Sequence, residues 1–388
     1  MKIGIDARLW NESGVGRYTR NLVDQLQVLD KKNEYVLFVQ SRDHDNIKYH
    51  LQCKQMSNVK WKIVDVDIRW HTLSEQIKFP SILNKENLDL VHFPYFSIPF
   101  FYNKPFVVTI HDLIINHFDT GKASTLPSPV YFLKRFGYDL VLKKAINNSR
   151  KIIAVSNTTK KEIIDHFKIN EDKIIVTYEG VDEEILKAEN KELDISKPYF
   201  LYVGNAYPHK NLERLLEAFR LFCHPEASAE GSHEILRFAQ NDIRLVLVGK
   251  EDYFYKKIKE DIKKNEFGDR VIFYGEANDR ELVSLYKNAV ALVVPSLMEG
   301  FGLPALEAMA CGCLVLASEI DSLKEVCVDS AIYFNPFDEN DLENKLKLII
   351  NLKNKSVYVK KGIERSKLFS WEKMARETLK VYESCISL

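Results

Sequence analysis

The sequence has no excess of either charge, because its 388 residues include 55 basic and 55 acidic side chains and the formal net charge is +0. A chain without a global positive field is a poor general binder of nucleic acid, so any basic surface must be local. Cysteine is also scarce, with six residues. Cys311 and Cys313 are separated by one glycine, closer than in a zinc knuckle. We therefore expect buried thiols in a reducing compartment and no metal site.

Long apolar runs are missing as well. None approaches the roughly 18 residues that a membrane-spanning helix needs, and the opening MKIGIDARLW enters a strand pattern without a charged and apolar leader. We therefore expect a cytoplasmic protein. With 46% hydrophobic and 28% charged residues, the chain can build a large core and is long enough for two or three domains.

Short β-rich runs alternate with helical patterns along the chain. The first half contains KIGID, EYVLFVQ and PFVVTIHD, and the second half begins again with YFLYVG, IRLVLVGK and ALVVPS. This alternation predicts two doubly wound α/β domains with parallel sheets, spanning 1–195 and 196–370. The boundary follows from a polar stretch before Pro198. Some helix starts are also legible, since Asn278 and Glu281 form a capping pair in the sequence.

One connection is too long for this pattern. Residues 223–242 separate a helix pattern from the next strand, whereas such connections usually have about 2 to 6 residues. We interpret the segment as an insertion at the sheet edge opposite the ligand-binding edge, with a partner-binding loop as the functional alternative. Its deletion is expected to leave activity intact.

The most informative stretch is VVPSLMEGFGLPALEAMACGCLVLA, in which a glycine-rich turn joins an apolar strand to a short helix. Gly300 and Gly302 let the backbone approach a ligand closely. The free amides and partial positive charge of a helix N-terminus suit a phosphate or diphosphate. Glu299 precedes this helix and Glu307 lies within it, so two carboxylates flank the predicted phosphate seat. Two solvated glutamates beside an ordinary turn are the alternative.

The pattern Glu299-GFGLPAL-Glu307 resembles the donor-site motif of retaining GT-B glycosyltransferases, in particular the GT4 family, or glycosyltransferase group 1. The resemblance implies two Rossmann-like domains facing a central cleft, with the donor in the second domain and the acceptor in the first. It also implies that the last helix, 371–388, packs back toward the N-terminal domain. The implied activity transfers a sugar from a nucleotide diphosphate sugar to a hydroxyl of a glycan or lipid-linked acceptor, with retention and without a cofactor or metal.

The same resemblance assigns roles to residues of this motif. Glu307 would accept hydrogen bonds from the ribose hydroxyls of the donor, and Glu299 would lie against the transferred sugar as a catalytic residue. The backbone amides near the middle of the turn would face the diphosphate or the sugar; these belong to Gly300, Phe301 and Gly302.

The second domain opens with YFLYVGNAYPHKNLERLLEAF, in which Lys210 arrives at the start of a helix after a strand. An ammonium group there can pair with a diphosphate. GT4 enzymes commonly carry an arginine or small polar residue after the glycine of this loop, and this chain has Asn205. Donor binding is therefore expected to depend on Lys210, helix amides and His209. A solvated first-turn lysine is the alternative.

In the first domain, Gly14 and Gly16 precede an amphipathic helix within NESGVGRYTRNLVDQL. The dinucleotide fingerprint fails because Thr19 stands at the third glycine position. The pair is either a simple tight turn or, by resemblance to GT4, a loop across the cleft from the donor diphosphate. His111 ends the run PFVVTIHD at the carboxyl end of a strand, and it resembles the GT4 histidine that contacts the transferred sugar. A hydrogen-bonded structural histidine is the alternative.

Aromatic and basic residues gather in two segments of the first domain, 92–103 and 129–151. Basic residues interleaved with aromatics can hold a helix against anionic lipid, and many GT4 enzymes act on lipid-linked acceptors. A peripheral contact with the inner face of the cell membrane and a solvated basic face beside core aromatics both stay open. The residues for the membrane contact are Lys134, Arg135, Lys143 and Lys144.

The donor and the class of protein have alternatives. The GIDAR and GVGRYTRNL wording looks most like mannosyltransferase-type members, which favours GDP-mannose over a UDP-sugar. Asn205 and the inserted segment favour a catalytically silent sugar-nucleotide-binding partner. A glycoside hydrolase would use two carboxylates but has no use for a phosphate seat. An oxidoreductase is disfavoured by the failed fingerprint.

Overall fold

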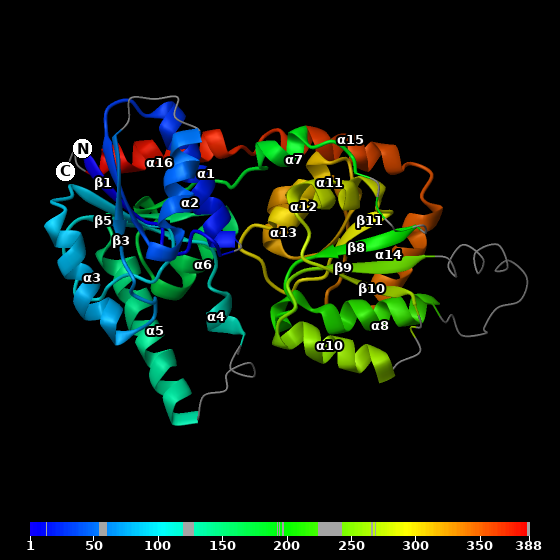
Figure 1. The fold of residues 1–388 in the computed structure, drawn as a ribbon. Helices are drawn as coiled ribbons and strands as arrows, with labels where there is room; N and C mark the ends of the chain where they lie inside the picture. The colour runs from blue at the N-terminus through cyan, green and yellow to red at the C-terminus, as the bar shows by residue number, and fades with distance from the viewer. Residues whose placement is uncertain are drawn as a thin grey trace, which may run out of the picture. The chain divides into compact units, whose positions relative to one another are not determined.

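The computed structural model describes residues 1–12, 14–53, 60–118, 128–191, 198–223, 243–264 and 269–385, together with 193, 195 and 267. The chain forms two compact units (Figure 1). Unit 1 comprises Met1–Leu113, Ser124–Gly180 and Ser370–Leu388, and unit 2 comprises Ile114–Ala123 and Val181–Phe369. The division falls after Gly180 and not near residue 195, because helix α7 (Glu183–Lys187) packs on α11 (Asp279–Asn288) of unit 2.

Unit 1 is built on a seven-stranded sheet in the order β3-β2-β1-β4-β5-β6-β7, with every neighbouring pair parallel. Strands β4 and β5 are buried along their whole length, as expected where helices cover both faces of a parallel sheet. The strands are β1 (Lys2–Asp6), β2 (Glu34–Val39), β3 (Lys60–Asp65), β4 (Leu90–Phe93), β5 (Phe106–Ile110), β6 (Lys151–Ala154) and β7 (Ile174–Val176).

The helices of unit 1 bury one apolar stripe each. In α1 (Gly14–Leu29) the buried residues include Tyr18, Leu22 and Leu26, which the four-residue spacing places on one face. The other helices are α2 (His44–Cys53), α3 (Leu73–Lys85), α5 (Ser128–Asn148), α6 (Asn157–Phe167) and α16 (Trp371–Ser384), with short 3-10 turns at Ser41–Asp43 and Glu171–Lys173.

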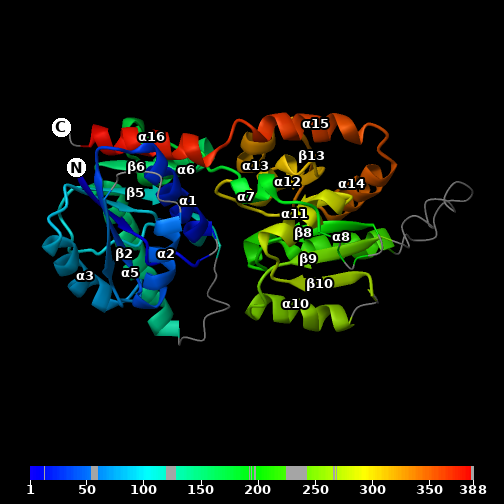
Figure 2. The same cartoon turned by 45° about the horizontal axis from the view of Figure 1, so that its top comes forward.

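The C-terminal helix α16 is part of unit 1 and lies along α1 (Figure 2). Its Tyr382 hydroxyl lies 2.6 Å from Nδ1 of His92 on β4, and Nε2 of the same ring lies 2.8 Å from Oγ1 of Thr109 on β5. All three side chains are fully buried. Buried polar groups are costly unless they are hydrogen-bonded, so this chain of contacts fixes the register of α16 on the sheet.

Unit 2 is built on a six-stranded parallel sheet in the order β10-β9-β8-β11-β12-β13. A hydrophobic core cluster of this unit includes Phe200 on the sheet, Phe219 on α8 and Leu346 on α14, all fully buried. The strands are β8 (Tyr199–Val203), β9 (Arg244–Val248), β10 (Val271–Gly275), β11 (Ala291–Val294), β12 (Val315–Ser318) and β13 (Ala331–Phe334).

Helices flank the sheet of unit 2 on both sides (Figures 1 and 2). Besides α7 and α11 they are α8 (Leu212–Cys223), α10 (Tyr253–Lys264), α12 (Leu303–Ala310), α13 (Asp321–Cys327), α14 (Glu339–Asn351) and α15 (Lys355–Ser366), with a 3-10 turn at Pro208–Lys210. The short helix α4 (Ile114–His117) also belongs to unit 2. The predicted pair of doubly wound α/β domains is confirmed. The predicted insertion at 223–242 lies outside the described residues, except for Cys223 at the end of α8.

Each sheet has one point at which the strand order reverses. In unit 1 this point lies between β1 and β4, and in unit 2 between β8 and β11. The loops that leave such neighbouring strands run to opposite sides, and the crevice outside their carboxyl ends is where doubly wound sheets bind ligands. The loops after β1 and β4, and those after β8 and β11, are therefore the places where a site is expected.

Candidate active site

A buried ion pair occupies the reversal point of unit 2. Lys210 closes the 3-10 turn after β8, and Glu299 lies in the loop after β11. Lys210 Nζ lies 2.7 Å from Glu299 Oε1, and Ser296 Oγ donates to the same oxygen at 2.7 Å. The two charged side chains are only 16% and 10% exposed, so neither is the solvated surface group of the alternative interpretation.

The environment of Glu299 keeps its carboxyl group ionised. Burial acts to raise its pKa, but the attraction and hydrogen bond of Lys210 and the hydrogen bond of Ser296 outweigh burial, so the pKa lies below its ordinary value. Ser296 was not among the site residues predicted from the sequence. Its signal was its place two residues after the end of β11, where the chain turns away from the sheet edge.

Asn211 joins the loops around this pair. Its backbone is left-handed at φ 59, a conformation that asparagine tolerates better than most residues. Its side-chain amide donates to the carbonyl oxygens of Pro295 at 3.0 Å and Pro336 at 2.9 Å. One side chain thus connects the segments that follow β8, β11 and β13. Sequence reasoning missed this residue, because its role depends on contacts between distant segments.

His209 lies beside Lys210 and is 6% exposed. Burial, together with the charge of Lys210, lowers the pKa of its ring to about 4, so the imidazole is neutral at pH 7. Nδ1 has no hydrogen-bond partner among the described residues, which is uncommon for a buried polar atom. The His209 carbonyl accepts from the backbone N–H of Leu297 at 2.7 Å, which fixes the two loops against each other.

The turn before α12 depends on Gly302. This residue has φ 100 and ψ 47, and a Cβ atom there would lie 2.7 Å from Leu323 Cδ2. Its carbonyl accepts from the N–H groups of Ala305 and Leu306 at 3.0 and 3.2 Å, so the helix begins at once. Pro304 stands in the first turn, where a missing N–H costs no intrahelical bond.

Phe301 and Glu307 are both buried, in different ways. The Phe301 ring is 3% exposed and packs edge-on against Phe369 with centroids 5.6 Å apart, so its side chain belongs to the core and only its backbone can serve a ligand. Glu307 is 2% exposed, and the Tyr286 hydroxyl of α11 donates to its Oε2 at 2.9 Å. Sequence reasoning did not identify Tyr286, because its contact with Glu307 joins two different helices.

The loop after β8 is held by hydrogen bonds within the loop and by tyrosine hydroxyls of β8 and α10. The Gly204 backbone, at φ 153, accepts a hydrogen bond from the Tyr255 hydroxyl at 3.0 Å. The side-chain oxygen of Asn205 accepts from the backbone N–H of Tyr207 at 3.3 Å, while the Tyr202 hydroxyl donates to the Asn205 carbonyl. Asn205 therefore shapes this loop through its side chain as well as its backbone.

In unit 1, His111 directly follows β5 and is held on both sides of its ring. Nδ1 lies 3.2 Å from Glu179 Oε1, and Nε2 lies 2.9 Å from the Pro94 carbonyl oxygen. A carboxylate and a carbonyl oxygen are both acceptors, so this geometry favours the imidazolium form, in which both ring nitrogens donate. Burial acts to lower the His111 pKa, but the hydrogen bond and charge of Glu179 outweigh burial and raise it. Glu179 was missed, because it lies far from His111 in the sequence.

The two glycines at the start of α1 differ in their surroundings. A Cβ atom on Gly16 would lie 2.4 Å from the Trp10 carbonyl oxygen and 2.7 Å from that of Leu9, whereas a Cβ atom on Gly14 would meet nothing within 4 Å. Gly16 is therefore required by close packing of the helix start on the preceding turn, and Gly14 is not.

The basic residues of α5 do not form one uniform surface. Lys134 and Lys143 are exposed, and Arg135 lies 3.9 Å from Asp139. Lys144 donates to the Phe100 carbonyl and lies 4.6 Å from the centre of that ring. Over the described part of the chain, no helix has the length and apolar character needed to cross a membrane.

Within the same described ranges, no group of three or more His, Cys, Asp or Glu side chains could hold a metal ion. The described cysteine side chains are free thiols, buried at all positions but one, which is half-buried; they are Cys223, Cys311, Cys313, Cys327 and Cys385.

Comparison with known proteins agrees with this arrangement. Residues 183–365 match the family described as glycosyl transferases group 1, and residues 13–185 match glycosyltransferase family 4. An uncharacterised glycosyltransferase of Methanocaldococcus jannaschii is 30% identical over 78% of this chain and 77% of its own length. The O-antigen chain mannosyltransferase RfbU of Salmonella typhimurium is 28% identical over 73% of this chain and 71% of its own.

Three other similarities extend over nearly the whole chain. O-antigen chain mannosyltransferase B of Escherichia coli is 26% identical over 96% of both chains. The sucrose-phosphate synthase structure from Thermosynechococcus elongatus superposes with a TM-score of 0.76 at 20% identity, covering 100% of this chain and 99% of that one. The structure of the Anabaena protein HepE in complex with UDP and glucose superposes with a TM-score of 0.71 at 16% identity, covering 99% of this chain and 100% of that one. The chain belongs to the GT4 family of group 1 glycosyltransferases and is a glycosyltransferase of the GT-B fold.

Proposed function

We propose that this glycosyltransferase takes mannose from GDP-mannose and transfers it, with retention at the anomeric carbon, to a hydroxyl of a glycan or lipid-linked acceptor. Two relatives named as O-antigen chain mannosyltransferases support mannose as the sugar. A UDP-sugar is the second candidate, supported by the UDP complex of HepE, which has the same fold. The observation that carries the proposal is the Lys210–Glu299 pair beside the start of α12, at the reversal point of the unit 2 sheet.

The proposed mechanism uses fixed positive charge. When the sugar–oxygen bond breaks, negative charge grows on the leaving diphosphate. In this proposal Lys210 and the backbone N–H groups of Gly302 and Leu303, at the start of α12, stabilise that charge with little reorganisation during the reaction. The neutral His209 ring offers a further hydrogen bond from its unpartnered Nδ1 side. We propose that no metal takes part.

The carboxylates have separate proposed tasks. Glu307 accepts hydrogen bonds from the ribose hydroxyls, and Tyr286 holds it in position for them. Glu299 lies against the transferred sugar, where its negative charge steadies the oxocarbenium-like centre, and Lys210 keeps it ionised. Gly14, Gly16 and His111 of unit 1 complete the proposed set, the last as an imidazolium facing the sugar.

We further propose that α5 touches an anionic membrane surface through its basic residues. The exposed Phe136, at 61%, and Leu140, at 41%, accompany Lys134 and Lys143 on this helix. Apolar side chains beside lysines suit an interfacial contact. Salt-sensitive co-sedimentation with anionic vesicles tests it, and its loss in Lys134→Glu/Lys143→Glu is expected.

The donor proposal is tested by thermal shift with a panel of UDP-, GDP- and ADP-sugars. A ligand at 100 times its dissociation constant stabilises the protein by about 2.7 kcal/mol, which raises the Tm by several degrees. Glu307→Gln is expected to abolish the shift given by GDP-mannose. Glu343→Gln is the matched control, because Glu343 is also buried, at 8% exposure, but lies on α14. Equal shifts in wild type and Glu307→Gln would remove Glu307 from the donor site.

Assays of the released products separate the other classes of protein. A catalytically silent partner would bind the donor but release no GDP with any acceptor. A glycoside hydrolase would release sugar from an oligosaccharide without any nucleotide. Release of GDP that depends on an acceptor supports the proposed transferase.

A further inference from the structure

A buried pair of side chains, Glu179 and His111, lies within unit 1, and the proposed function uses only the histidine. The His111 side chain is 14% exposed and that of Glu179 is 6% exposed. His111 directly follows β5, and Glu179 lies in the segment after β7. An ionised carboxylate at this depth is costly unless it is paired, so the place of Glu179 depends on the histidine beside it.

The contacts of the His111 ring engage both of its nitrogens. The Pro94 carbonyl oxygen, 2.9 Å from Nε2, can only accept, so Nε2 carries a proton. Glu179 Oε1 lies 3.2 Å from Nδ1, and an ionised carboxylate is an acceptor as well. With both nitrogens donating, the ring is positively charged and has no lone pair with which to take a proton from an acceptor hydroxyl.

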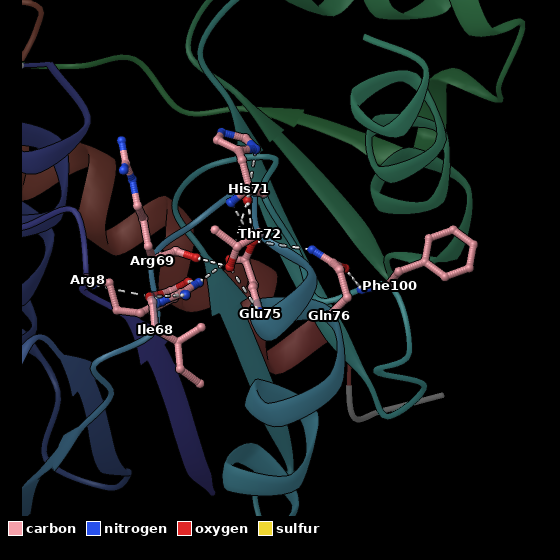
Figure 3. A network of polar contacts seen from close by, with 10 residues as sticks. Arg8, Ile68, Arg69, His71, Thr72, Glu75, Gln76 and Phe100 are labelled. Atoms are coloured by element: carbon pink, nitrogen blue, oxygen red, sulfur yellow. Dashed lines mark hydrogen bonds and ion pairs between the residues drawn. The ribbon is translucent and has the colours of Figure 1, made fainter. Parts of the chain in front are cut away.

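The segment that carries Pro94 is held in place by α3. Ser97 Oγ donates to Glu75 Oε2 at 3.2 Å. The backbone N–H of Phe100 donates to Gln76 Oε1 at 2.5 Å (Figure 3). The carbonyl that accepts from His111 therefore belongs to a segment with two side-chain anchors on one helix.

An ion pair fixes Glu75 in turn. Arg8 Nη2 lies 2.6 Å from Glu75 Oε1 and 2.7 Å from Oδ2 of Asp6 at the end of β1, and Nη1 donates to the Ile68 carbonyl at 3.1 Å (Figure 3). The side chains of Arg8 and Glu75 are 2% and 0% exposed. Side chains packed at this depth have little freedom to move, so the anchor of the Pro94 segment is rigid.

The segment that carries Glu179 is held by close packing on the start of α16. A Cβ atom on Gly180 would lie 2.3 Å from the backbone nitrogen of Trp371 and 2.5 Å from the carbonyl carbon of Ser370. Only a residue without a side chain lets the two backbones approach so closely. The place of Glu179 is therefore set by its neighbour in the chain and by the C-terminal helix.

The other titratable groups around the ring either favour its charge or are neutral at pH 7. Burial acts to lower the His111 pKa, whereas Glu179 and, more weakly, the charge of Asp112 raise it. Tyr18 of α1 lies edge-on to the ring with centroids 5.0 Å apart, and burial raises its pKa to about 12. His92 of β4 is neutral, because burial lowers its pKa to about 3. Glu179 is thus the main source of negative charge at the ring.

We propose that Glu179 is a positioning residue for sugar transfer, which holds His111 in one orientation and as a cation, so that the histidine acts by its charge and not as a general base. A cation that faces the donor stabilises the negative charge that grows on the leaving diphosphate. This contribution to transfer rests on the proposed function. The effect of Glu179 on the charge of the ring does not, since it follows from contacts within unit 1.

The first test measures the His111 pKa in the full chain without nucleotide. NMR of ring-labelled histidine reports it, and the His111 signal is identified by its loss in His111→Gln. Glu179→Gln keeps the shape of the side chain and removes its charge. An opposite charge at this distance shifts a pKa by about 1 to 3, so the variant should lower the His111 pKa by at least about 1. Glu179→Asp keeps the charge and should return the pKa toward the wild-type value.

The second test measures kcat for the release of GDP from GDP-mannose, with water as the acceptor, as a function of pH. In the wild type kcat should fall as the pH rises through the His111 pKa, because the charged ring is the active form. In Glu179→Gln the fall should begin at least about one pH unit lower. Glu343→Gln, which removes a buried carboxylate of α14 in unit 2, is the matched control and should leave both the pKa and the profile unchanged.

Three results would overturn the proposal. The first is an unchanged His111 pKa in Glu179→Gln. The second is a kcat that rises with pH over the same range, as a general base requires. The third is a loss of kcat in Glu179→Gln that is equal at every pH, which a purely structural role would give. If the variant lowers the pKa but the wild type releases no GDP, the proposed function falls and takes the catalytic role with it, while the charge control of His111 by Glu179 stands.

Discussion

The ion pair between Lys210 and Glu299 makes a quantitative prediction about unit 2. Lys210→Met removes the ammonium group and keeps most of the side-chain length, so Glu299 is left buried with the hydrogen bond from Ser296 but without its cation. Removing one member of a fully buried pair costs about 3 to 5 kcal/mol. Lys210 and Glu299 are 16% and 10% exposed, so water reaches both groups. We therefore expect a smaller loss, of about 2 to 3 kcal/mol, in the free energy of unfolding.

The loss should depend on pH in a defined direction. In the wild type the Glu299 pKa is lowered, so its contribution is present above the ordinary glutamate value and is lost as the pH falls through the folded value. In Lys210→Met, burial raises that pKa instead, so the variant carries its full penalty at pH 7 and regains stability as the pH approaches about 5.

A double-mutant cycle with Glu299→Gln isolates the pair. The double variant, Lys210→Met/Glu299→Gln, has no buried charge left unpaired, so its loss should be smaller than the sum of the single losses by about 2 kcal/mol. Urea unfolding in the absence of nucleotide, monitored by circular dichroism, measures this coupling energy. Fluorescence is unsuitable, because all four tryptophans lie in unit 1. A coupling energy below about 0.5 kcal/mol, or a deficit unchanged between pH 7 and pH 5, would refute the reasoning.

Two further predictions concern unit 1, where tryptophan fluorescence reports unfolding. Gly16→Ala should lower the free energy of unfolding by about 1 to 3 kcal/mol, because the new Cβ would lie 2.4 Å from the Trp10 carbonyl oxygen. Gly14→Ala is the control and should change it by less than about 1 kcal/mol. Similar losses in the two variants would contradict the close packing at Gly16. Because the His111 pKa is raised in the folded state, the stability it contributes is present below the ordinary value of about 6.5 and is lost as the pH rises through the folded value. His111→Gln should therefore flatten the dependence of Tm on pH between about pH 6 and 9. An unchanged slope would contradict this role of His111.

Local patterns predicted the elements that depend on neighbouring residues. The Asn278 and Glu281 pair forms a complete capping box at the start of α11. Gly302 adopts the positive φ that a glycine-rich turn allows, and α12 begins directly after it. The strand runs are apolar because both faces of each parallel sheet are covered, so their alternation with helices predicted both sheets.

Contacts between distant segments could not be predicted in this way. Glu179 reaches His111 across 68 positions of the sequence, and Asn211 reaches Pro336 across 125. The unit boundary was placed too late for the same reason, because the contact of α7 with α11 is invisible in a local pattern. Amino-acid composition and the period of the hydrophobic pattern predict the helices and strands. The partner of a buried polar group, in contrast, is set by the packing of helices, strands and loops that lie far apart in the sequence.

The two reversal points show that one sheet topology can carry two different sets of charged side chains. After β8 and β11 the chain offers a lysine and the start of a helix, and its carboxylate Glu299 is held by that lysine. After β1 the chain offers the carboxylate of Asp6 and a guanidinium whose charge is cancelled from within. The first place is the proposed binding place of the donor diphosphate, which Lys210 and the backbone N–H groups at the start of α12 would stabilise. The side chains that follow the strands therefore give the two reversal points different charged groups, although the strand order reverses in the same way in both sheets.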